Sequence, residues 1–155
     1  MSPSGPDPFD LERFVRAQSA HYDTALAELQ RGRKRTHWSW FVFPQLRGLG
    51  RSDMAVRYAI SGLPEAAAFL AHATLGPRLR ACVAAMNRHA GVSATAILGD
   101  IDATKFHSCV TLFAQVSPPG TVFHEALAIH FGGQPDGATL RLLADQRGER
   151  GGHRG

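Results

Sequence analysis

Residues 102–116 read DATKFHSCVTLFAQV and form a strongly helical pattern. At ~100° per residue, one apolar stripe runs along such a helix. It consists of Phe106, Cys109, Val110, Phe113 and Val116. Because an apolar stripe of this width is stable only when other elements cover it, the segment predicts a core helix, with Asp102 as its N-cap.

A second stripe of the same helix is polar and mostly uncharged. It consists of Lys105, Ser108, Thr111 and Gln115. Serine and threonine are mediocre helix formers, and a solvent face usually carries Glu, Lys and Arg, so helix propensity does not explain this stripe. Three interpretations stay open: the stripe lines a cleft, packs against another helix, or faces solvent.

Upstream, residues 37–44 read HWSWFVFP. Pro44 cannot continue a helix, so this aromatic run predicts one or two helical turns. Large aromatic side chains are costly to leave in water, and we expect one core to contain Phe41, Phe43, Phe106, Phe113 and Phe123. Trp38 and Trp40 have two interpretations: core side chains, or an aromatic wall beside a planar ligand.

Capping and breaker residues divide the rest of the chain into helical segments, whereas strand signals are almost absent. These segments are 10–31 (one helix, or two with a kink near Ser19), 52–60, 64–70, 76–89, 93–98, 122–131 and 136–144. The expected N-caps among them include Asp10, Ser52 and Ser93. The predicted fold is all-α, a single compact domain of seven to nine short helices, with helix in about half or more of the residues. We expect this domain to span residues 10–145, between a disordered lead (1–9) and a disordered basic tail (146–155).

Composition is typical of a soluble globular protein. Of 155 residues, 44% are hydrophobic and 19% are charged. No apolar run approaches the ~18 residues of a membrane span, and residues 1–8 lack the features of a signal peptide, so we expect a cytoplasmic protein without a membrane partner. Cys82 and Cys109 lie in apolar helical patterns, which favours buried reduced thiols over a disulfide or a reactive site. The oligomeric state is left open.

The formal net charge is +4. One cluster of the excess lies in a short segment that contains Arg31, Arg33, Lys34 and Arg35. Such a loop could bind nucleic acid, but aromatic residues that would stack on bases accompany it only just after Arg35. A solvated loop is the simpler interpretation, so nucleic acid is not the favoured partner.

Familiar catalytic signatures do not occur in the sequence. There is no phosphate-binding loop motif, no Gly-x-Ser-x-Gly elbow and no His-Glu-x-x-His pair. The eight histidines are scattered, without carboxylates or thiols at metal-ligand spacing. We therefore predict no metal site and no cofactor.

The loop 45–52 is the second candidate for ligand contact. Its two glycines allow the backbone to approach a ligand, and the helix that follows presents free N–H groups that attract an anion. The candidate contacts are Gln45, Gly48, Gly50, Arg51 and Ser52. We expect this loop and the polar stripe to face one cleft, with Arg51 and Lys105 as its cations.

Several blocks of the chain resemble one bacterial family in order and spacing. They include Arg13-Phe14-Val15, His37-Trp38-Ser39-Trp40-Phe41, Phe43-Pro44-Gln45-Leu46, Gly48-Leu49-Gly50-Arg51-Ser52 and Lys105-Phe106-His107-Ser108. The family is catalogued as domain of unknown function eighteen-ten, and the resemblance runs from about Asp10 to Leu143. It implies a compact multihelical fold and no established activity. Some members carry a calpastatin label, which does not suit this chain because such inhibitors are long disordered repeats.

The function expected from these features is binding or processing of an anionic, planar metabolite, such as a nucleotide or an ADP-ribose derivative. Arg51, Lys105 and Arg78 would hold the anion, Trp38 or Trp40 would form the wall, and His37 is the candidate acid or base. A fainter resemblance to ADP-ribose glycosidases with a NADAR domain, at Lys105-Phe106, favours the nucleotide variant. Whether the protein is an enzyme stays open. The alternative is a protein-interaction or regulatory module without catalysis, and nucleic-acid binding ranks third.

Overall fold

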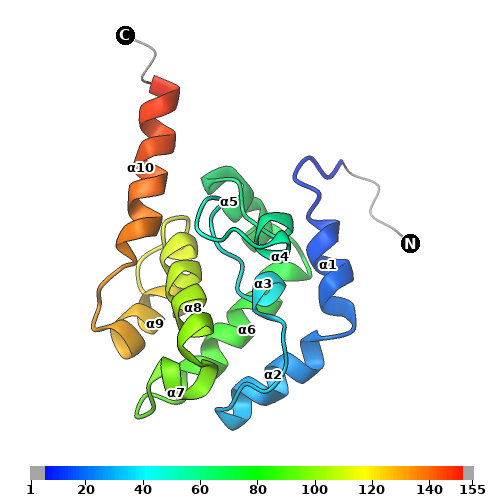
Figure 1. Ribbon diagram of the computed structural model, residues 1–155, viewed down its shortest axis with the longest axis vertical. Coiled ribbons are helices and arrows are strands. Elements are labelled where there is room, and N and C mark those ends of the chain that lie inside the picture. The colour runs from blue at the N-terminus through cyan, green and yellow to red at the C-terminus, as the bar shows by residue number, and fades with distance from the viewer. Residues whose placement is uncertain (1–5, 152–155) are drawn as a thin grey trace.

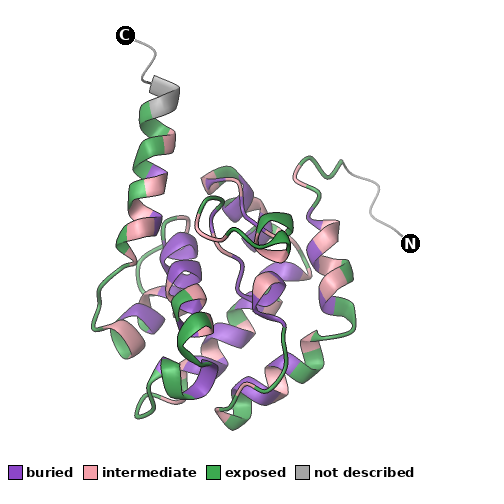
Figure 2. Cartoon of the chain, viewed as in Figure 1, coloured by how far each residue is buried: buried purple, intermediate pink, exposed green. Residues whose placement is uncertain are grey.

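Helix α8 (Asp100–Ala114) lies at the centre of the computed structural model, which describes residues 6–151. The predicted apolar stripe is buried: Phe106, Cys109 and Phe113 are each 0% exposed. The helix begins two residues earlier than predicted, after Gly99, so Asp102 lies inside its first turn and is not the N-cap. Figure 2 shows the burial rising along α8 from an exposed first turn to a buried second half.

Helix accounts for 64% of residues 6–151 and no strand occurs among them, which confirms the all-α prediction. Besides α8, the helices are α1 (Glu12–Ser19), α2 (Tyr22–Arg31), α3 (Ser39–Val42), α4 (Asp53–Arg57), α5 (Leu63–Ala71), α6 (Leu75–Asn87), α7 (Ala94–Leu98), α9 (Val122–Phe131) and α10 (Gly137–Gly151). The ten helices of the described range exceed the seven to nine predicted, since residues 12–31 form two helices. They separate at Ser19, whose hydroxyl donates to the carbonyl of Arg16 and ends α1.

Figure 1 shows the arrangement of the helices, with the C-terminal part of α10 extending away from the others. The buried core between the helices contains many aromatic side chains. Helix α9 packs against both α6 and α8, and α5 also contacts both. All five phenylalanines expected in the core lie in this one cluster, which confirms that prediction. Phe43 contacts Phe106, and Phe113 lies between Phe69 and Phe123. The single turn of α3 before Pro44 therefore serves to direct the aromatic run into the centre of the molecule.

A short backbone contact joins the loop after α3 to the segment after α4. The amide of Arg47 donates to the carbonyl of Ile60 at 2.8 Å, and the amide of Ile60 donates to the carbonyl of Gln45 at 2.8 Å. These bonds form an isolated parallel bridge between Leu46 and Ile60. The bridge fixes Arg47 beside the connection between α4 and α5.

Both expected disordered ends contain order within the described range. Residues 146–151 continue α10 in place of the predicted tail, and Nε2 of Gln146 donates to the carbonyl of Ser61 at 2.9 Å. At the other end, Asp7 accepts hydrogen bonds from the amides that start α1, so the lead is structured from this residue. Residues 1–5 and 152–155 lie outside the described range.

Cys82 and Cys109 are buried and unpaired, in agreement with the expected reduced thiols. Burial raises the pKa of Cys82 to about 12 and raises that of Cys109 well above its usual value. Neither thiol therefore ionises near neutral pH. Within residues 6–151, no helix has both the length and the apolar character needed to cross a bilayer.

Candidate functional site

The two tryptophans of the aromatic run have different surroundings. Trp38 is fully buried, and its Nε1 donates to Oε1 of Glu28 at 2.9 Å. Trp40 is half-buried, and Nζ of Lys105 lies 4.7 Å from the centre of its ring. Trp38 is therefore a core side chain, whereas Trp40 presents part of its ring to the surface.

Lys105 belongs to a cluster of three charged groups at the start of α8. Oδ2 of Asp102 lies 2.8 Å from Nζ of Lys34, and Oδ1 lies 3.5 Å from Nζ of Lys105. Burial opposes ionisation of this carboxyl, but the hydrogen bond and charge of Lys34, together with the charge of Lys105, lower the pKa of Asp102. Asp102 thus shares its single negative charge between two lysines, with the closer contact to Lys34, and the cluster keeps a net positive charge.

The carboxylate of Glu28 organises the basic loop between α2 and α3. It accepts hydrogen bonds from the amides of Arg35 and Thr36, the hydroxyl of Thr36 and the indole of Trp38, at 2.8–3.1 Å. Burial alone would raise its pKa, but these hydrogen bonds outweigh it and lower the pKa of Glu28 from 4.5 to about 2. The loop is therefore folded around a permanent negative charge.

This arrangement predicts a stability that depends on Glu28 and on pH. In neutral solution, Glu28→Gln should lower the free energy of unfolding by about 1.5–3 kcal/mol, since hydrogen bonds to a charged group are lost. The folded pKa is depressed, so the stabilisation is present above pH 4.5 and is lost as pH falls through about 2. Urea denaturation of both proteins across this range should show the difference between them shrinking with acidification. A difference that is constant with pH would contradict the assignment.

The other residues of the basic loop are exposed. Arg31, Arg33 and Arg35 face solvent, and so does His37. Lys34, in contrast, is tied down by its ion pair with Asp102. Nucleic-acid binding by the exposed arginines and a catalytic role of His37 both stay predictions. None of these residues lines either of the hollows around Arg13.

The loop 45–52 lies against α4 and α10. A Cβ atom at Gly50 would come within 2.5 Å of Cβ of Ala55, and one at Gly48, whose φ is +103°, would come within 3.3 Å of Leu142. These glycines therefore allow close packing of the chain on itself. Ser52 caps α4 as predicted, with its hydroxyl accepting from the amide of Ala55. Arg51 is exposed and forms no hydrogen bond or ion pair with any residue between 6 and 148.

The polar stripe of α8 packs against the start of α10. Ser108 and Thr111 are buried; the hydroxyl of Thr111 accepts from the amide of Asp136, and that of Ser108 donates to its carboxylate. Asp136 in turn accepts from the amide of Thr139 and caps α10. The structure therefore brings Lys105 to Trp40 and the two hydroxyls to α10, away from an open cleft. Of the three interpretations of the stripe, helix packing describes these two residues.

Arg78, the remaining predicted ligand contact, has protein partners. Its Nη1 donates to Oε1 of Gln18 at 3.3 Å, and its guanidinium lies 4.8 Å from the ring centre of Tyr22. It joins α6 to α1 and α2.

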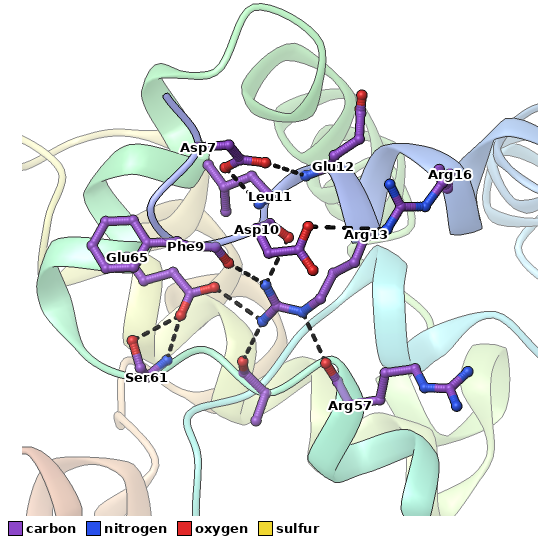
Figure 3. A network of polar contacts seen from close by, with 11 residues as sticks. Asp7, Phe9, Asp10, Leu11, Glu12, Arg13, Arg16, Arg57, Ser61 and Glu65 are labelled. Atoms are coloured by element: carbon purple, nitrogen blue, oxygen red, sulfur yellow. Dashed lines mark hydrogen bonds and ion pairs between the residues drawn. The ribbon is translucent and has the colours of Figure 1, made fainter. Parts of the chain in front are cut away.

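Sequence reasoning missed a second polar centre, built on Arg13 of α1 (Figure 3). An arginine side chain has five N–H donors. Those of Arg13 donate to the carbonyls of Phe9, Asp10, Arg57 and Ala59 and to Oε2 of Glu65, over 2.6–3.0 Å. Every donor is used, so Arg13 holds the segment before α1 against the connection between α4 and α5.

Glu65 completes this clamp. Its side chain is 3% exposed, and its second oxygen accepts from the amide and the hydroxyl of Ser61, each at 2.8 Å. The Arg13–Glu65 pair is therefore neutral and satisfied, and it forms the floor of the surface above it.

Two adjoining hollows open around this clamp. Both are lined by Asp10, Arg13 and Arg57; one adds Arg16 and Tyr58, and the other adds Arg47. We call this surface the arginine groove and define it by Asp10, Arg16, Arg47, Arg57 and Tyr58. With Arg13 and Glu65 neutralising each other, the lining of the two hollows contains three further arginines and one further carboxylate, that of Asp10. In the part of the chain that the structure describes, neither Arg47 nor Arg57 forms an ion pair.

Little in the sequence could have revealed this groove. Its cations come from three segments, and the contacts that assemble it join residues 44 to 52 positions apart. Helical periodicity reports on neighbours within a few residues and is silent on such pairs. One signal was present: Arg13-Phe14-Val15 is among the blocks that resemble the family.

Among the residues from 6 to 148, no three His, Cys, Asp or Glu side chains converge as they would to hold a metal ion.

Comparison with known proteins points to an uncharacterised family. A family model described as "Protein of unknown function (DUF1810)" matches residues 8–143, which include the whole arginine groove. The chain is also similar to the crystal structure of the conserved hypothetical protein Rv1873 from Mycobacterium tuberculosis. Sequence identity is 51%, the TM-score is 0.87, and the match covers 89% of this chain and 99% of that one. No curated protein matches.

Proposed function

The chain belongs to the family "Protein of unknown function (DUF1810)", and from its arginine groove we propose that it binds a small anionic metabolite. The observation that supports this is the lining of the two adjoining hollows, which contains Arg16, Arg47 and Arg57 with the carboxylate of Asp10 as the opposing charge that is not neutralised within the clamp. Guanidinium groups present paired donors that match phosphate and carboxylate oxygens, so such a cluster favours anions of this kind.

The clamp beneath the groove makes the binding surface rigid before a ligand arrives. All the N–H donors of Arg13 bind protein acceptors. Arg13 therefore positions the segments that line the groove and does not itself contact the anion. The Leu46–Ile60 bridge holds Arg47 in the same way. A surface that is ordered in advance loses less entropy on binding, which supports affinity in a shallow site.

An aromatic side chain in the lining supports the planar part of the ligand expected from the sequence. Tyr58 is half-buried, with its ring packed on Phe14 and Phe41 at centroid distances of 5.7 and 5.4 Å. Its fixed ring offers one flat apolar surface next to Arg57. A nucleotide or ADP-ribose derivative carries both a flat ring and phosphate and therefore fits this proposal.

Isothermal titration calorimetry with phosphate-bearing metabolites, selected by a thermal-shift screen, tests the proposal. Arg47→Ala and Arg57→Ala should each weaken binding by about tenfold or more, because each removes charge-assisted hydrogen bonds. Arg88→Ala is the matched control: it removes an equal charge from an exposed position at the end of α6, outside the groove. The proposal fails if no anionic metabolite binds, or if the control weakens binding as much as the groove variants do.

A further inference from the structure

We infer that the ligand of the arginine groove is a phosphorylated sugar, whose phosphate lies on the arginines and whose hydroxyls donate to Asp10. This inference rests on the proposed function and narrows it. It is carried by the carboxylate of Asp10, which has one weak ion pair and accepts no hydrogen bond within residues 6–148, although it lines the same hollows as the arginines.

The carboxylate of Asp10 has no strong partner in the described part of the chain. Its one ion pair, with Nη2 of Arg16, spans 3.9 Å between side chains that are 65% and 67% exposed. Pairs of this kind contribute little and open readily. No hydrogen bond to the carboxylate from residues 6–148 occurs, so both oxygens are available to a ligand. An ionised carboxylate only accepts hydrogen bonds, and it therefore selects ligand groups that donate.

The position of Asp10 is held by an unusual backbone. Its φ is +51°, and among non-glycine residues from 6 to 151 it alone has a positive φ. Asp and Asn tolerate this region better than most residues, but it is still disfavoured. Two bonds from Nη1 of Arg13, to the carbonyls of Phe9 and Asp10, enforce the conformation from one side. On the other side, Asp7 takes over the capping of α1, as Figure 3 shows.

This arrangement frees Asp10 from the role that the sequence predicted for it. Asp7, and not Asp10, accepts from the first amides of α1, so the carboxylate of Asp10 is not needed to cap the helix. It lies instead where the two hollows of the groove meet, together with Arg57. Figure 3 shows its carboxylate beside Arg13, with the ion pair to Arg16 drawn as a dashed line.

The chemistry of the three arginines and Asp10 defines the ligand class. For a bare anion, the repulsion by Asp10 offsets part of the attraction of the arginines and leaves the carboxylate without a donor, and a neutral sugar would leave the guanidinium groups without partners. A sugar phosphate carries hydroxyl donors and an anion within a few bonds of each other, so it satisfies both at once. Ribose 5-phosphate is the probe that carries both groups, and inorganic phosphate is the probe for the arginines alone.

Calorimetric titration of both probes into the wild-type protein and three variants tests the inference. Wild type should bind ribose 5-phosphate more tightly than phosphate. Asp10→Asn should weaken ribose 5-phosphate by about tenfold and leave phosphate binding equal or tighter, since it removes an acceptor and a repulsive charge. Arg57→Ala should weaken both. Asp10→Gly, which also relaxes the left-handed backbone, should repeat the loss for ribose 5-phosphate with an unchanged or higher melting temperature.

The possible failures are distinguishable. If phosphate binds and ribose 5-phosphate binds no more tightly, or if both Asp10 variants keep full affinity for ribose 5-phosphate, the sugar inference is overturned while anion binding stands. If neither probe nor any anionic metabolite binds wild type, the proposed function itself is overturned, and the inference with it.

Discussion

Replacement of Phe113 by alanine should lower the free energy of unfolding by about 3–5 kcal/mol. Phe113 is 0% exposed and lies in the last turn of α8. Its ring lies 5.3 Å from that of Phe69 in α5 and 5.9 Å from that of Phe123 in α9, measured between centroids. Removal of the ring leaves a cavity among three helices whose positions are fixed by many other contacts, so the site cannot collapse to fill it.

Urea or thermal denaturation followed by circular dichroism measures this loss. Ile101→Ala is a matched control in the same helix, because Ile101 is 74% exposed and its truncation should change stability by less than about 0.5 kcal/mol. If Phe113→Ala costs less than about 1 kcal/mol, the apolar stripe of α8 does not form the centre of the core.

The core could be predicted because its signals are local. The positions of Phe106, Cys109 and Phe113 repeat with the helical period, and a stripe of that kind has one stable location. Two N-caps could also be predicted from local signals. Ser52 and Ser93 accept hydrogen bonds from the amides of Ala55 and Ala96, as N-cap residues do. These features depend on residues within one or two turns of each other.

The charged residues were harder to place, because an aspartate near a helix start has several stable uses. Asp102 has the sequence context of an N-cap, yet two lysines, one of them 68 positions away in the chain, give it a better partner. In the same way, Asp7 and not Asp10 accepts hydrogen bonds from the first amides of α1. Local propensity describes what a side chain can do, whereas the choice among its uses is made by tertiary contacts.

The polar stripe of α8 shows the same limit for residues that were candidates for ligand binding. The sequence left three interpretations of its small hydroxyl residues open: a cleft, helix packing or solvent. These residues could not be assigned to the cap of α10, because the partner residue, Asp136, approaches only after α9 has turned the chain back. The arginine groove is a stronger case, since each of its walls comes from a different segment and none has a periodic pattern.

Loss of Arg13 should destabilise the protein about as much as loss of Phe113, although no apolar core is touched. Arg13→Ala should cost about 3–5 kcal/mol, because it leaves the buried carboxylate of Glu65 without its counter-ion. It also leaves the carbonyls of Arg57 and Ala59 without the donors that they have in the native structure. Arg16→Ala, in the same helix and 67% exposed, is the control and should cost less than about 1 kcal/mol.

A double-mutant cycle separates the charge of the clamp from its hydrogen bonds to the backbone. In a Glu65→Gln background, Arg13→Ala should cost at least about 1 kcal/mol less than it does in the wild type, because an amide does not need a counter-ion. An undiminished cost would mean that the carbonyl contacts, and not the ion pair, stabilise the clamp. In either case, Arg13→Ala protein that is still folded should bind anions less tightly, although Arg16, Arg47 and Arg57 are unchanged. The reason is that the segments that carry these three arginines are no longer held together.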